Sequence, residues 1–136
     1  MNIRFFDTEH QNSYNHLCEK YGINQNSRDH VLLMYLLSAI IEADDPRIND
    51  LISKDNSGIL VKDDALCHEW ITEGYARIIR LAFHLYTWKA PTTSSLTEKL
   101  AEEEIKQYLP MELLCGLDNR LTEIALESLR MLCYWS

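Results

Sequence analysis

The fold of this chain depends most on residues 31–41, which read VLLMYLLSAII. Ser27 ahead of them is a residue type that starts helices, and Glu42 with Pro46 marks the end of the pattern. The apolar side chains cover nearly every side of the expected helix. Such a helix lies at the centre of a core or beneath a partner subunit. The apolar surface exceeds what one small core needs, so a homodimer is among our expectations.

Helical periodicity also runs through the sequence on both sides of this segment. A surface helix is expected between a cap at Asp7 or Thr8 and a stop at Gly22, since these residue types favour helix starts and helix ends. Longer helices are expected over residues 72–88 and from Asp118 or Asn119 onward, with shorter ones over residues 46–52 and 63–70, after Ser95 or Thr97, and after Pro110.

The clearest turn in the sequence is at residues 54–58, which read KDNSG. Residues 59–61, Ile-Leu-Val, are expected to form one short strand, but no partner strand is evident and so no sheet is expected. The sequence therefore predicts an all-α fold. We expect an irregular bundle of about five or six helices that forms a single domain over residues 1–136.

The chain is acidic, with a formal net charge of −8 that follows from 21 acidic and 13 basic residues. Phosphate is repelled by such a chain, so direct nucleic-acid binding is not expected. The charge serves solubility, or it suits a basic partner protein. Acidic residues gather at Glu42-Asp44-Asp45, at Asp63-Asp64 and between residues 98 and 104, and only clustering in space would make them a functional surface.

The cysteines point to a reducing compartment. Cys18, Cys67, Cys115 and Cys133 form no CxxC pair, and each lies among apolar residues, as buried free thiols do. The N-terminus lacks the long apolar region of a secretory signal, and residues 31–41 are about half as long as a membrane span. We therefore expect a cytoplasmic protein that does not enter a membrane.

The best candidate site is a polar stripe on the expected helix over residues 72–88. Glu73, Arg77, Arg80 and His84 follow one another at steps of four, three and four, so they share one face, and Tyr86 completes the candidate set. Two arginines and a histidine suit a phosphate or a carboxylate ligand. An internal ion-pair network that includes Glu73 explains the same residues.

Other chemistry has weaker support in the sequence. Asp7, Glu9, His10 and His16 lie on or near one helix, but they do not form a metal-ligand pattern, and no HExxH motif occurs. There is no GxSxG motif, P-loop or GxGxxG motif, and Cys67 is interpreted as a packing residue. No cofactor, no metal and no catalytic residue is expected, and an enzyme is the less favoured class.

Residues 80–86, RLAFHLY, resemble the core motif of an uncharacterised family of small helical proteins from Gram-positive bacteria and their mobile elements. His84 departs from the asparagine of that motif. The opening residues Phe5-Phe6-Asp7 and the closing residues 124–130 are also similar to the family. The resemblance implies an all-helical fold and a phage or mobile-element setting, and it implies no activity.

Three functions remain open from the sequence. The first is a non-enzymatic protein-interaction module, such as an inhibitor or accessory protein of a mobile element. The second is a small ligand-binding protein or enzyme that uses the face of Arg77, Arg80 and His84. The third is a regulator that touches nucleic acid through a local basic patch.

Overall fold

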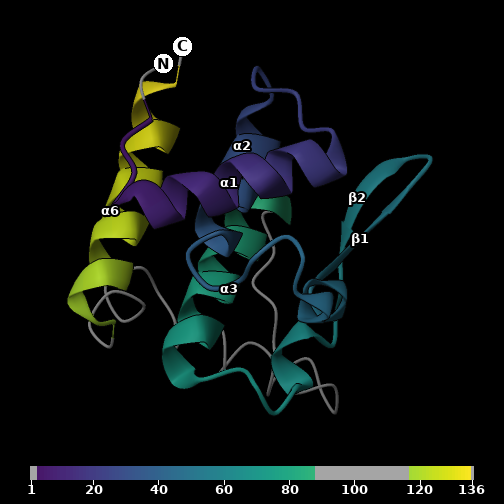
Figure 1. Ribbon diagram of the computed structural model, residues 1–136. Helices are drawn as coiled ribbons and strands as arrows, with labels where there is room; N and C mark the ends of the chain where they lie inside the picture. Colours follow the sequence, from purple (N-terminus) through teal and green to yellow (C-terminus); the bar gives the residue numbers. More distant parts are fainter. Residues whose placement is uncertain (1–2, 88–116, 136) are drawn as a thin grey trace.

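The computed structural model describes residues 3–87 and 117–135. Its elements in these ranges are the helices α1 (Thr8–Tyr21), α2 (Arg28–Leu37), α3 (Glu73–Thr87) and α6 (Asn119–Tyr134), the 3₁₀ helices η1 (Pro46–Asp50) and η2 (Ala65–Cys67), and the strands β1 (Ile52–Asp55) and β2 (Gly58–Val61) (Figure 1). The expectation of an all-α bundle of five or six helices is wrong, because the described part has four α-helices and a two-stranded antiparallel sheet. The helices expected after Ser95 or Thr97 and after Pro110 lie outside the described residues.

The sheet is a hairpin that projects from the helices (Figure 1). Its register joins Ile52 to Val61, Ser53 to Leu60, Lys54 to Ile59 and Asp55 to Gly58. The expected turn is confirmed, and the Asp55 carboxylate stabilises it by accepting hydrogen bonds from the Ser57 amide and hydroxyl at 2.8 and 2.6 Å. The missing strand is β1, which begins at Ile52, the last residue of the helix that the sequence suggested over residues 46–52, and continues into the expected turn. That helix is the 3₁₀ helix η1, which ends at Asp50 and leaves the buried Ile52 to pair.

α2 is the central helix, since α1, α3 and α6 all pack against it. Every residue from Val31 to Leu37 is at most 1% exposed, so the chain itself covers this apolar helix. The apolar character of α2 therefore needs no partner subunit to explain it. The helix ends at Leu37, earlier than expected, because the amides of Ala39 and Ile40 donate to carbonyls three residues back and the Ser38 hydroxyl donates to the Tyr35 carbonyl at 2.8 Å.

α3 and α6 complete the core beside α2. Asp118 caps α6 as expected, because its carboxylate accepts a hydrogen bond from the Leu121 amide at 2.8 Å. α6 then buries Ile124, Ala125 and Met131. Over residues 3–87 and 117–135, no helix combines the length and the apolar character that crossing a membrane requires.

α1 has the two caps that the sequence predicts. The Asp7 carboxylate accepts a hydrogen bond from the His10 amide at 2.8 Å, and Gly22 ends the helix in the left-handed region with a φ of 61°. The expectation of a surface helix is wrong in its first turns, because His10 and Ser13 are buried with exposures of 0% and 3%. α1 therefore contributes polar as well as apolar side chains to the interior.

We expect the substitution Gly22→Ala to lower the free energy of unfolding by about 1 to 2 kcal/mol, since a side chain disfavours the left-handed region. The new Cβ would also lie 3.2 Å from Lys54 Nζ, whose ammonium donates to the Tyr21 carbonyl. Gly74→Ala is the matched control, because Gly74 lies in α3 and alanine favours a helix over glycine. Urea denaturation that finds the same loss for both variants would contradict this explanation.

Candidate functional site

The polar stripe on α3 passes through different environments along the helix. Glu73 is exposed, and its carboxylate accepts a hydrogen bond from Arg77 Nη2 at 2.9 Å. Arg80 is buried at 5% exposure, whereas His84 is exposed. The structure thus brings Glu73 and Arg77 together as an ion pair of the kind that an internal network needs. Whether this face binds a ligand stays a prediction.

Tyr86 does not join the arginines of the stripe. Its hydroxyl donates to the Ile59 carbonyl at 2.8 Å and lies 3.4 Å from His30 Nε2. His30 Nδ1 in turn lies 2.6 Å from the Ser27 hydroxyl. Tyr86 therefore ties α3 to β2 and to the first turn of α2, and this position gives it a structural role.

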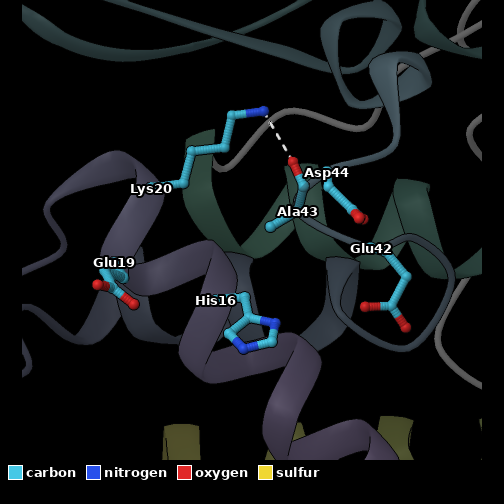
Figure 2. Close-up of a pocket in the computed structure, with 6 residues that line it drawn as sticks. All are labelled: His16, Glu19, Lys20, Glu42, Ala43 and Asp44. Atoms are coloured by element: carbon cyan, nitrogen blue, oxygen red, sulfur yellow. Dashed lines mark hydrogen bonds between the residues drawn. The ribbon is translucent and has the colours of Figure 1, made fainter.

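A hollow lies elsewhere, between α1 and the segment that follows α2. It has a volume of about 680 Å³, and we call it the acidic hollow; its lining residues are His16, Glu19, Lys20, Glu42, Ala43 and Asp44 (Figure 2). None of the residues on the α3 stripe lines it. The hollow forms only in the folded chain, because Glu19 and Glu42 are far apart in sequence. They line the same hollow because α1 packs on α2.

Three carboxylates and one ammonium set the charge of the acidic hollow. Figure 2 shows Lys20 reaching across from α1, where its ammonium donates to the Ala43 carbonyl at 2.8 Å. Asp45, the third member of the acidic set after α2, does not join the hollow. It forms an ion pair with Arg47 at 2.7 Å, and the hydrogen bond from this guanidinium holds the pKa of Asp45 below its ordinary value. The acidic set therefore divides between a hollow and the cap of η1.

A second, smaller hollow of about 420 Å³ lies between the N-terminal segment and α6. Its lining includes Arg4, Phe6, Asn119 and Glu123. Glu127 also contributes, and its carboxylate is held by two hydrogen bonds of 2.9 Å from Arg130 Nε. No feature of the sequence marked this place, because residues 4–6 and α6 meet only in the folded chain.

The residues weighed for metal or thiol chemistry are spread over the structure. His10 is buried and His16 is exposed, and no group of three or more metal-ligating side chains occurs within residues 3–87 and 117–135. Cys18 is buried as expected, and burial raises its pKa. The expectation of buried thiols is wrong for Cys67 and Cys133, which are exposed, since the short η2 and the outer face of α6 leave them at the surface.

Comparison with known proteins gives a family and nothing closer. No curated protein matches the chain, and no solved structure matches it. A family model described as a family of unknown function (DUF6075) matches residues 1–131. This match agrees with the resemblance to an uncharacterised family and extends over nearly the whole chain. The chain therefore belongs to the family of unknown function DUF6075.

Proposed function

We propose that this protein is a non-enzymatic interaction module that binds a basic surface of a partner protein at the acidic hollow. The observation that carries the proposal is that Glu19 on α1 lines the same hollow as Glu42 and Asp44, which follow α2. Clustering in space is what distinguishes a functional acidic surface from isolated caps and solvated faces. Here one carboxylate of α1 lines the same hollow as two carboxylates that follow α2.

The exposure of these carboxylates favours a role in binding a partner over a role in stabilising the fold. Glu19, Glu42 and Asp44 are all exposed. Ion pairs made by exposed groups contribute little to folding, whereas charges on an interface rim speed association and select the partner. The formal charge of −8 on the whole chain also attracts a basic partner at long range.

Charge reversal within the hollow is expected to weaken binding to a basic peptide at least about tenfold, which is about 1.4 kcal/mol. The probe is a hexa-arginine peptide, and the variant combines Glu42→Lys with Asp44→Lys. The control combines Asp63→Lys with Glu69→Lys, which are also exposed and change the net charge equally. Fluorescence anisotropy at about 0.15 M ionic strength, where the Debye length is about 8 Å, measures both affinities.

The control decides between a site and a general effect of charge. A specific hollow predicts less than about threefold weakening in the control variant, because distant exposed charges are largely screened. Equal weakening of peptide binding in both variants would show that net charge alone causes the effect. No binding by the wild-type protein would refute the proposal.

An inhibitor or accessory role on a phage or mobile element belongs to the same proposal. Its support is the resemblance carried by residues 80–86 together with the acidic charge of the chain. A cytoplasmic setting is proposed on the free cysteines Cys18, Cys67 and Cys133, which suit a reducing compartment. The alternative of a ligand at Arg77, Arg80 and His84 gains no support from the two described hollows, since none of these residues lines either one.

A further inference from the structure

The N-terminal segment of the described chain is fastened across the interior by aromatic contacts. Residues 3–7, which we call the N-terminal strap, run beside α6 before α1 begins (Figure 1). The Phe5 ring lies 5.4 Å from the His10 ring, 5.2 Å from that of Tyr14 and 5.8 Å from that of Tyr35. The strap therefore packs on α1 and α2 through the ring of Phe5.

Two hydrogen bonds hold the strap backbone at Arg4 and Phe6, ahead of the Asp7 carbonyl, which accepts from the Gln11 amide at 3.1 Å. The Tyr35 hydroxyl donates to the Arg4 carbonyl at 2.7 Å, and the Phe6 amide donates to His10 Nδ1 at 3.3 Å. Phe6 itself is 42% exposed, so its ring anchors the strap poorly. The backbone of Phe6 is thus held by a nitrogen lone pair of His10, while its ring lies 5.9 Å from the Arg120 guanidinium.

His10 is fixed in one neutral form by its two partners. Its side chain is fully buried, and Nε2 lies 3.0 Å from the Tyr35 carbonyl. A carbonyl only accepts, so Nε2 carries the hydrogen and Nδ1 is the acceptor for Phe6. A second proton would go to Nδ1, where it would face the Phe6 amide hydrogen and abolish that hydrogen bond.

The surroundings of His10 oppose a positive charge. Burial is the main cause that lowers its pKa below 6.5, and Arg120 on α6 acts in the same direction. The hydrogen bond to the Tyr35 carbonyl and the nearby Asp7 carboxylate oppose this shift. Tyr14 from α1 faces the same cluster with a raised pKa, so its hydroxyl stays neutral. On α6, Glu127 and Arg130 lie near Tyr35 as an ion pair.

We propose that neutral His10 holds the N-terminal strap in place, and that protonation of His10 releases the strap from α1, α2 and α6. We call this contact the latch, and the protein with the strap in place the latched form. Release frees Arg4, Phe5 and Phe6, which form one wall of the smaller hollow beside α6. The hollow then opens toward the ring of Tyr35, which the latched strap keeps buried. Acidification would therefore change both the shape and the apolar exposure of this face.

The direction of the effect follows from linkage. Release of the strap exposes the Nδ1 side of His10 to water and brings its pKa back toward the ordinary value, whereas the latched form resists the proton. The latch is fully effective above pH 6.5 and weakens as the pH falls toward the lower pKa of the latched form. In that interval the population with a released strap rises by up to about tenfold for each pH unit.

Hydrogen exchange of the Phe6 amide, read by NMR from pH 7.5 to pH 5, tests the latch. After correction for intrinsic exchange, protection of this amide is expected to fall below about pH 6.5, by up to about tenfold per pH unit. The variant His10→Gln keeps a donor toward the Tyr35 carbonyl and takes up no proton, so its protection should not change with pH. His16→Gln, which alters an exposed histidine of the same helix, should behave as the wild type.

The Leu33 amide in the core of α2 supplies the internal reference. Equal protection of Phe6 and Leu33 at every pH would mean that the strap opens only with the whole fold, and it would overturn the proposal. An unchanged pH slope in His10→Gln would overturn it as well. If that variant does not fold, lower and pH-dependent protection of Phe6 than of Leu33 in the wild type supports the latch, and protection of Phe6 that is independent of pH refutes it.

Discussion

Replacement of Leu33 by alanine is expected to lower the free energy of unfolding by about 2 to 5 kcal/mol. Leu33 is 0% exposed in the middle of α2, the helix against which α1, α3 and α6 all pack. Removal of its side chain loses apolar burial and leaves a cavity that three surrounding helices cannot close without moving. Urea denaturation followed by circular dichroism measures the loss.

Leu60→Ala is the matched control for this prediction. Leu60 lies in β2, and 47% of it is exposed, so the same change removes little buried surface. We expect a loss of less than about 1 kcal/mol, most of it from the weaker strand preference of alanine. Losses of similar size in the two variants would contradict the placement of α2 at the centre of the core.

The second large effect is expected for His10→Ala, which should lower the free energy of unfolding by about 2 to 4 kcal/mol at pH 7.5. The imidazole is fully buried among aromatic rings, and its loss leaves a cavity. The partly buried Phe6 amide also loses its acceptor, which adds to the penalty. The Tyr35 carbonyl keeps the Ser38 hydroxyl as a donor, and this limits the effect.

His16→Ala on the same helix is the control, since His16 is exposed and the change in helix preference is the same. It should alter stability by no more than about 0.5 kcal/mol. The gap between wild type and His10→Ala should also narrow as the pH falls from 7.5 to 5. The pKa of His10 is lowered by folding, so its contribution is complete above 6.5 and is lost at lower pH. A gap that widens on acidification would be incompatible with a buried neutral histidine.

Local signals in the sequence predicted the ends of helices well. Asp7 and Gly22 bound α1, and Asp118 caps α6, because caps are decided by a few neighbouring backbone groups. The central position of α2 was also predictable, since an apolar surface on all sides has to be covered. What covers it, the chain or a second copy, depends on packing that the residues of α2 do not encode by themselves.

Features that depend on pairing between distant segments were not predictable. Ile52 pairs with Val61 only because η1 stops two residues earlier, and the sequence of residues 46–52 is equally compatible with a longer helix. The burial of His10 follows from the position of the Tyr35 carbonyl on another helix. Likewise, Glu19 and Glu42 are unremarkable surface residues until α1 and α2 pack together.

The packing of α6 against α2 has a consequence for biosynthesis. The ribosome makes α2 first, and 97 residues separate its end at Leu37 from the end of α6 at Tyr134. At about 5 to 20 residues per second, translation needs roughly 5 to 20 seconds to supply this last wall of the core. During that interval the apolar side of α2 that faces α6 stays accessible on the nascent chain, where chaperones bind and where truncated products would aggregate.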